Sequence, residues 1–181
     1  MIELNTLNHA SKRDFVAALA AIFEHSPWVA ERVADLRPFA SGIALHRALC
    51  DAVMQAPEAQ QLALIRAHPQ LAGRAAIRGD LTAASTSEQR GAGLPYCTPD
   101  QLERLNSLNA EYSSRFGFPF VLAVRGHTPQ SVIAAMERRV THEVRQEIAV
   151  ALSEIFSIAR FRLEDLLQES CGDAINPRTP P

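Results

Sequence analysis

The chain has 181 residues, of which 47% are hydrophobic and 21% charged, a composition typical of one globular domain with an apolar core. Its 18 basic and 20 acidic side chains give a formal net charge of −2, without the basic excess that is typical of nucleic-acid binding. The longest apolar run, Phe15 to Phe23, is too short to cross a bilayer, and no signal-peptide pattern is seen. We therefore expect a cytoplasmic protein that binds neither nucleic acid nor a membrane.

Side chains suited to covalent or metal chemistry are few. Cys50, Cys97 and Cys171 are too scattered to predict a disulfide framework or a zinc knuckle, which favours a reducing compartment. Lys12 is the only lysine, so a Schiff base to a substrate or to pyridoxal phosphate has one candidate amine, in a polar stretch at a helix start. His46 and Cys50 lie one helical turn apart, but no second ligand pair accompanies them, and no metal site is predicted.

The first part of the chain predicts four helices, over residues 14–24, over 27–37, from residue 41, and over 57–66. Apolar residues recur there every three or four positions, and Ser or Pro stands at the expected starts. The residues of the third helix expected to face the core are Ile43, Leu45, Leu49, Val53 and Met54. The fourth helix must end near Arg66, because His68 precedes Pro69 and is pushed into extended geometry.

The rest of the chain predicts longer helices around one extended segment. Residues 73–84 lack a period and predict an irregular loop, after which a helix begins at Ser85 and another runs from Thr98 through Ser114. Residues 116–124 are aromatic and apolar and are expected to be extended and buried, and final helices run from Thr128 to about residue 167. The fold class is therefore all-α, a single-domain helical bundle over 1–170 with a flexible tail at 171–181.

Three side chains are candidates for chemistry on local evidence. His68 is fixed by Pro69 in a defined turn, which suits proton transfer, but a histidine there also commonly caps its own helix. Glu88 follows Ser85 at capping-box spacing, so it either caps the helix or, with Gln89, binds a polar ligand. Arg162 continues an apolar stripe and needs an anionic partner, either a protein carboxylate such as Glu88 or a substrate. These alternatives stay open at this point.

Four motifs, read together, resemble the OHCU decarboxylase family, whose full name is 2-oxo-4-hydroxy-4-carboxy-5-ureidoimidazoline decarboxylase. The motifs are AHPQLAG at 67–73, LTAASTSEQRGAGL at 81–94, RFGFPF at 115–120 and IARFRL at 158–163. The resemblance implies an all-α, homodimeric, cofactor-free enzyme of urate degradation that removes carbon dioxide to give (S)-allantoin. It does not extend to residues 139–142, where the family has a different pattern, so any role there is in doubt.

The resemblance also implies site residues. His68 corresponds to the catalytic histidine, and Pro69 to a neighbouring substrate contact. The remaining substrate-binding positions implied are Ser85, Thr86, Ser87, Glu88, Gln89, Phe120, Val121, Leu122, Ala123, Val124 and Arg162. Backbone groups of the segment Phe120–Val124 are expected to meet the substrate, and no metal ligand is implied.

The substrate's own chemistry agrees with the absence of a cofactor. Carbon dioxide leaves a carbon next to a C=N bond, and the imine accepts the electrons as an enaminol, so no pyridoxal or thiamin is needed. We expect His68 to exchange a proton with the substrate hydroxyl. The rival hypothesis is a non-catalytic helical interaction module, in which Arg162 and Glu88 form a structural ion pair and the phenylalanines line a groove for a partner.

Overall fold

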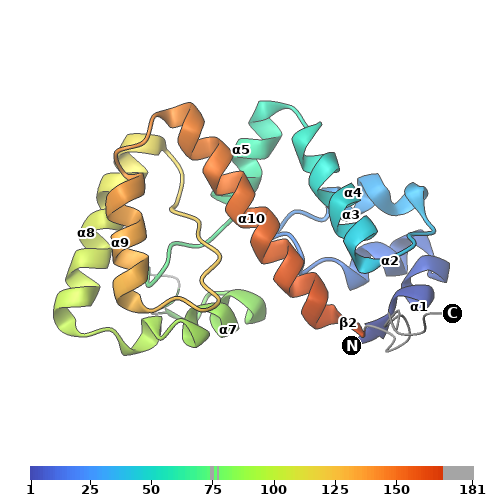
Figure 1. Ribbon diagram of the computed structural model, residues 1–181, viewed down its shortest axis with the longest axis horizontal. Coiled ribbons are helices and arrows are strands. Elements are labelled where there is room, and N and C mark those ends of the chain that lie inside the picture. The colour runs from blue at the N-terminus through green and yellow to red at the C-terminus, as the bar shows by residue number, and fades with distance from the viewer. Residues whose placement is uncertain (74–75, 77, 169–181) are drawn as a thin grey trace, which may run out of the picture.

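The computed structural model describes residues 1–73, 76 and 78–168, and over this part of the chain the fold is all-α (Figure 1). The elements are β1 (Ile2–Glu3), α1 (Leu4–His9), α2 (Lys12–Ala18), α3 (Trp28–Val33), η1 (Ala34–Leu36), α4 (Gly42–Met54), α5 (Glu58–Arg66), α7 (Ala83–Gly91), η2 (Leu94–Tyr96), α8 (Pro99–Phe116), α9 (Pro129–Arg139), α10 (Val144–Leu166) and β2 (Leu167–Gln168). The predicted tail at 171–181, and residues 74, 75 and 77 of the predicted loop, lie outside the described residues.

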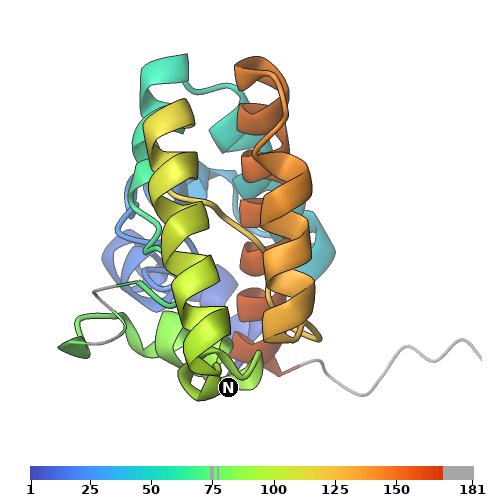
Figure 2. The same cartoon turned by 90° about the vertical axis from the view of Figure 1, so that its left-hand side faces the viewer.

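Helix α10 is the long central element of the fold. It crosses the molecule between the α8–α9 pair and the helices of the N-terminal half (Figure 1), and it packs on α4 and α5. Helices α8 and α9 lie side by side, as the turned view also makes clear (Figure 2). Leu152, Ile155 and Ala159 of α10 are buried in the core. Because one helix contacts both halves, residues far apart in sequence meet along its length.

The starts of α8 and α9 confirm the predicted helix signals. Thr98 and Thr128 each form a capping box with the residue three positions on, and a proline occupies the first turn of both helices. Helix α8 ends at Gly117, whose φ of 73° lies in the left-handed region that glycine adopts without steric cost. The chain is thereby turned into the segment 118–124, which forms neither helix nor paired strand and is buried as predicted, apart from half-buried Pro119 and Ala123. The extended segment predicted over 116–124 thus starts two residues too early, because Phe116 belongs to α8 and Gly117 is exposed.

The helix predicted over 14–24 is too long. Helix α2 ends at Ala18, and the chain continues through turns in which the amide of Ile22 donates to the carbonyl of Leu19. The carbonyl of Ala21 accepts a hydrogen bond from Arg162 at 2.9 Å. Breaking the helix here keeps Leu19, Ile22 and Phe23 buried while the backbone contacts a distant arginine.

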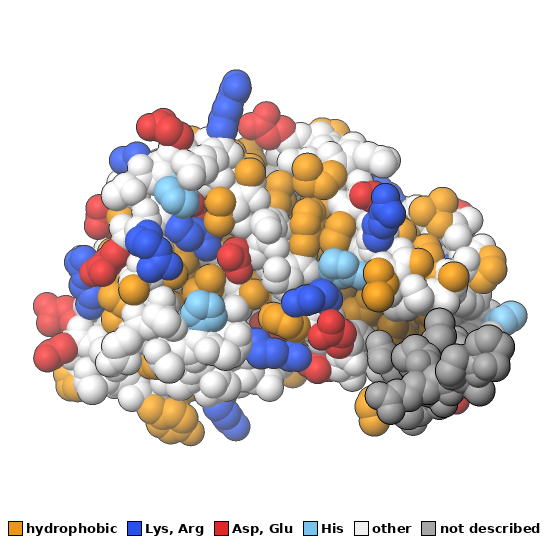
Figure 3. Space-filling model, viewed as in Figure 1, with side chains coloured by type: hydrophobic (Ala, Val, Ile, Leu, Met, Phe, Trp, Pro, Cys, Tyr) orange, Lys and Arg blue, Asp and Glu red, His pale blue; other side chains and the backbone are white. Residues whose placement is uncertain are grey.

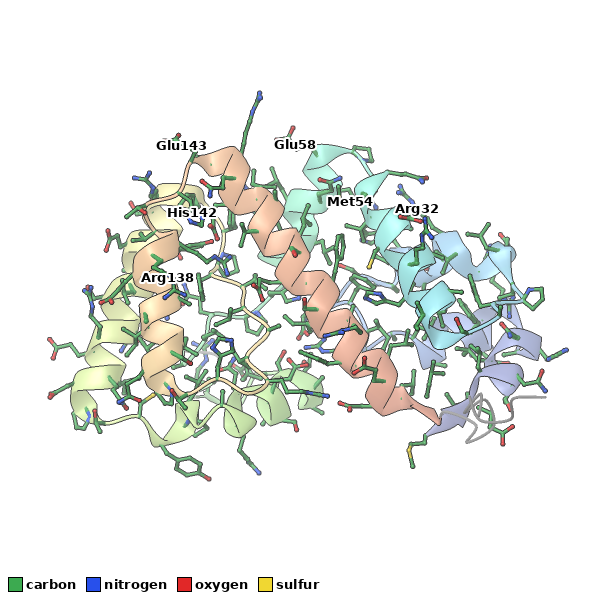
Figure 4. The ribbon with its side chains drawn as sticks, in the orientation of Figure 1. Arg32, Met54, Glu58, Arg138, His142 and Glu143 are labelled. Carbon is green, nitrogen blue, oxygen red and sulfur yellow. The ribbon has the colours of Figure 1, made fainter. Side chains whose placement is uncertain are left out.

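Two residues of α4 do not face the core as predicted. Leu45, Leu49 and Val53 are buried, but Ile43 and Met54 are mostly exposed, and Met54 lies at the end of α4 (Figure 4). The buried three are spaced by four positions and share one face, from whose centre positions 43 and 54 are rotated by roughly 120° and 140°. Apolar composition alone therefore overestimated the width of the buried face.

The short strands β1 and β2 and helix α1 were not predicted. Ile2 pairs with Leu167 in a parallel register, which joins the start of the chain to the end of α10. No helix in the described part of the chain is long and apolar enough to cross a membrane. On the face seen in Figure 3, basic and acidic side chains are interspersed.

Candidate active site

A small hollow lined by both polar and apolar side chains lies where α7, α10, the turn after α5 and the segment 120–124 meet. The hollow has a volume of about 20 Å³, which is room for about one water molecule. The side chains around it are those of His68, Pro69, Leu71, Ser85, Glu88, Gln89, Phe120, Val121, Leu122, Val124, Ile158 and Arg162. Next to it lies a larger groove of about 540 Å³, and Glu88 and Arg162 line both. These two side chains therefore form the wall between the hollow and the groove.

His68 follows the last turn of α5 and is buried. Its Nδ1 lies 3.0 Å from the carbonyl oxygen of Leu64, which can only accept a hydrogen bond, so Nδ1 carries a proton. Among the described residues Nε2 has no hydrogen-bond partner. Burial lowers the pKa of His68, although the Leu64 carbonyl and Glu24 oppose this. The ring is thus neutral near pH 7, with the lone pair on Nε2.

Arg162 is buried, and the protein occupies its five N–H groups. Its Nε donates to Oε1 of Glu88 at 2.7 Å, and one Nη2 hydrogen donates to Oε2 at 2.9 Å. The other Nη2 hydrogen reaches the Ser85 hydroxyl, at 3.3 Å. Nη1 donates to the Ala21 carbonyl at 2.9 Å and to Glu24 at 2.8 Å. Burial alone would lower the pKa of Arg162, but Glu88 and Glu24 outweigh it and raise the pKa.

Glu24 is a buried acid of this site that the sequence analysis missed. Besides Arg162, it accepts hydrogen bonds from the hydroxyls of Thr82 at 2.7 Å and Ser85 at 3.2 Å. Burial alone would raise the pKa of its carboxyl. The hydrogen bonds from Thr82 and Arg162 together outweigh burial, so the pKa of Glu24 is lowered. The signal in the sequence was a carboxylate directly after the apolar run that ends at Phe23, which needs a cationic partner when buried.

Helix α7 begins at Ala83, two residues earlier than predicted, and its cap differs. Thr82 is the N-cap, and its hydroxyl accepts from the amide of Ser85 at 3.2 Å. The capping-box interpretation of Ser85 and Glu88 is therefore wrong, because the side chain of Glu88 pairs with Arg162 instead. Gln89 is buried, and its Oε1 accepts from the amide of Ala72 at 2.9 Å. The side chain of Gln89 thus binds the segment that follows His68 to helix α7.

The segment Phe120–Val124 is fixed by two side chains from outside it. Arg139 donates to the carbonyl of Val121 at 2.8 Å, and its guanidinium lies 4.4 Å from the centre of the Phe120 ring. The amide of Ala123 donates to Glu154 at 2.9 Å. Arg139 is itself paired with the fully buried Glu147. The stretch 139–142, to which the sequence assigned no role, thus contains Arg139, which holds the segment 120–124 beside the hollow.

Glu147 joins several helices in one buried network. It accepts hydrogen bonds from Arg139 and from the hydroxyl of Tyr112, and its second oxygen lies 2.7 Å from Nδ1 of His142. Burial and the neighbouring Glu147 carboxylate raise the pKa of the Tyr112 hydroxyl, so Tyr112 acts as a donor. His142 and Glu143 lie where α9 gives way to α10 (Figure 4).

Most of the predicted site residues come together, and three do not reach the hollow. The predicted residues that line it are His68, Pro69, Ser85, Glu88, Gln89, Phe120, Val121, Leu122, Val124 and Arg162. Thr86 and Ala123 line neither space, and Ser87 lines the larger groove. The periodicity of α7 explains the placement of Thr86 and Ser87, because positions 85, 88 and 89 share a face from which 86 and 87 point away.

Candidates for covalent or metal chemistry lie elsewhere. Lys12 is half-exposed and forms an ion pair with Asp35 at 2.6 Å. Nε2 of His46 lies 2.9 Å from the carbonyl oxygen of Phe156, and Cys50 Sγ lies 3.5 Å from the same nitrogen. Burial raises the pKa of Cys50 to about 11, so it is a thiol near neutral pH. None of these three side chains lines the hollow.

Comparison with known proteins identifies a family of decarboxylating lyases. The family model described as OHCU decarboxylase matches residues 8–164. The chain is 43% identical over 164 residues to the 2-oxo-4-hydroxy-4-carboxy-5-ureidoimidazoline decarboxylase of Haloferax volcanii, covering 91% of this chain and 95% of that protein. This chain belongs to the OHCU decarboxylase family, which confirms the predicted resemblance.

Two further relatives are longer than this chain. It is 41% identical to the uric acid degradation bifunctional protein PucL of Bacillus subtilis, covering 99% of this chain and 35% of that protein. A crystal structure of (S)-allantoin synthase superposes with a TM-score of 0.77 at 31% identity, covering 93% of this chain and 54% of that one. The fold predicted from the sequence is thereby confirmed.

Proposed function

We propose that the protein decarboxylates 2-oxo-4-hydroxy-4-carboxy-5-ureidoimidazoline to (S)-allantoin in urate degradation. The observation that carries the proposal is the neutral, buried imidazole of His68. Its Nε2 has no hydrogen-bond partner among the described residues and shares a hollow with an arginine and a glutamate from two distant helices. Relatives named for this decarboxylation and for (S)-allantoin synthesis support the choice of substrate and product.

His68 acts in this proposal as the proton-transfer group. As the bond to the carboxylate breaks and carbon dioxide leaves, the two electrons of that bond form a C=C bond, and the π electrons of the ring C=N move onto its nitrogen. Nε2 accepts the proton of the substrate hydroxyl and passes it to this ring nitrogen, which leaves the enolate form of the enaminol. A positioned acid or base of this kind typically contributes about 10²- to 10⁴-fold in rate. Nδ1 keeps its proton and donates it in the hydrogen bond to the Leu64 carbonyl, so Nε2 alone exchanges protons with the substrate.

Arg162 and Glu88 bind the substrate by exchanging partners. The substrate is much larger than the 20 Å³ hollow, because ligand sites of this kind measure several hundred Å³. Glu88 is the more exposed partner, at 23% against 7% for Arg162, and moving it joins the hollow to the groove. The freed Nε–Nη2 edge of Arg162 then suits a carboxylate, while Glu88 accepts N–H groups of the ureido arm.

The remaining contacts explain how one enantiomer is formed. Pro69, Ser85 and Gln89, with backbone groups of Phe120, Val121, Leu122 and Val124, hold the ring in one orientation. Only one face of the enaminol is then protonated, and stereochemistry follows from positioning. Thr86, Ser87 and Ala123, which lie off the hollow, are proposed as supports of these contacts. The substrate supplies its own electron sink, so the proposal includes no cofactor and no metal.

The decisive experiment generates fresh substrate from urate and follows optical rotation with and without the protein. We expect rapid formation of (S)-allantoin with the protein and a slow racemic course without it. A racemic course at the spontaneous rate would contradict the enzyme proposal and favour the interaction module. The homodimer and the cytoplasmic location, both expected from the sequence, belong to the same proposal. Light scattering of the purified protein tests the dimer.

A further inference from the structure

Glu24 occupies the centre of a junction between three parts of the chain. It lies in the turns after α2, and its side chain is 2% exposed. One oxygen accepts from the hydroxyls of Thr82 and Ser85 at the start of α7, and the other accepts from Arg162 of α10. Both oxygens are thus occupied by donors on elements that line the hollow.

The two carboxylates that hold Arg162 differ in how firmly they are held. The side chain of Glu88 is 23% exposed and has Arg162 as its partner. Glu24 is buried and has two hydroxyl donors besides the arginine. A ligand carboxylate that displaces one of them displaces Glu88, because releasing Glu24 leaves a buried charge unpaired and the protons of two hydroxyls without their acceptor.

We propose that Glu24 is a positioning residue that holds the Arg162 guanidinium in one orientation, so that the edge vacated by Glu88 faces the substrate carboxylate. This inference rests on the proposed function. Nη1 of Arg162, fixed by Glu24 and the Ala21 carbonyl, sets the plane of the guanidinium. A planar group held at one end presents its other edge in a single direction.

The charge of Glu24 also acts on His68. The charged groups facing the imidazole in the described part of the chain are Glu24 from the turns after α2, Glu88 from α7 and Arg162 from α10. The two carboxylates favour the imidazolium, and Arg162 opposes it. Removing the charge of Glu24 therefore lowers the pKa of His68 further. A residue with only a packing role has no such effect.

The test compares Glu24→Gln and Glu24→Asp with the wild type. For Glu24→Gln, KM is expected to rise roughly 10- to 100-fold, the cost of a misdirected charged hydrogen bond, with a smaller fall in kcat. The pKa of His68, followed by NMR of the imidazole in the ligand-free protein, moves down, as does the acid limb of the kcat/KM profile. Glu24→Asp keeps the negative charge, but its shorter side chain cannot make the same contact with Arg162. KM therefore rises while the titration of His68 stays as in the wild type.

The matched control is Glu137→Gln, which removes the charge of an exposed glutamate held by Nε and Nη2 of Arg104; wild-type kinetics are expected. An unchanged KM and His68 titration in Glu24→Gln overturns the inference, and so does a lower Tm with both unchanged. If Glu24→Gln does not fold, a wild-type KM in Glu24→Asp overturns it. A wild-type protein that forms no (S)-allantoin overturns the proposed function itself, which distinguishes the two failures.

Discussion

Arg162 and Glu88 meet edge to edge, with Nε 2.7 Å from one carboxylate oxygen and Nη2 2.9 Å from the other. The two residues are 74 positions apart and come from α10 and α7. A bidentate pair of this kind fixes the relative angle of both side chains. The pair also lines both the hollow and the groove, so in the proposed function its opening is the step that admits substrate.

Replacing Glu88 therefore tests recognition. In Glu88→Ala, kcat/KM is expected to fall roughly 10- to 100-fold, because a hydrogen bond to a charged group is lost. The enantiomeric excess of allantoin is expected to fall with it, since the ureido arm is no longer held. Chiral chromatography of the product and initial rates measure both. A lower melting temperature with unchanged kinetics and stereochemistry would assign Glu88 a structural role alone.

The sequence predicted that Arg162 pairs with a carboxylate, but it did not predict that Glu24 is one of the partners. An arginine on an apolar helix face needs an anion, and the sequence analysis named Glu88 as a candidate. Glu24 lies 138 positions from Arg162 at the end of a stretch with a helical period. The periodicity predicted a helix through Glu24, whereas the chain leaves the helix after Ala18 and turns the carbonyl of Ala21 toward α10.

Local signals predicted the helix ends well where the capping residue acts on its own helix. Thr98 and Thr128 are examples, because their partners lie three residues away. The cap of α7 was misassigned, since Thr82 and Ser85 both fit an N-cap. The hydroxyl of Ser85 is engaged by Glu24 and Arg162 instead, and the Thr82 hydroxyl accepts from the backbone. Interactions across the fold, which no local pattern contains, decided between them.

The role of His68 gives a kinetic prediction. In His68→Asn, kcat is expected to fall about 10²- to 10⁴-fold, because no group remains to exchange the proton of the hydroxyl. His46→Asn is the matched control, since His46 also contacts a backbone carbonyl but lies outside the hollow. Near-normal formation of (S)-allantoin by His68→Asn would refute the assigned role, whatever the control shows.

Burial of His68 also makes stability depend on pH. The pKa of His68 in the folded protein lies below its ordinary value of 6.5, mainly because burial disfavours the charged ring. The unfolded chain therefore binds a proton first as pH falls below 6.5, and the folded state loses stability until the folded pKa is passed, at up to about 1.4 kcal/mol per pH unit. Urea unfolding of wild type and His68→Asn from pH 7.5 downward measures this. The prediction fails if the stability difference between them does not change with pH.

The buried pair of Arg139 and Glu147 yields a prediction about the stability of the folded protein. Arg139→Ala leaves the fully buried Glu147 without its cation and frees the Val121 carbonyl. Breaking a buried ion pair typically costs about 3 to 5 kcal/mol. Arg104→Ala breaks the exposed pair with Glu137 and is expected to cost about 1 kcal/mol or less. Because Arg139 holds the segment 120–124, its loss should also raise KM in protein that remains folded. Equal unfolding free energies for the two variants in urea titrations would contradict the assignment of Arg139 as the residue that holds the segment 120–124 in place.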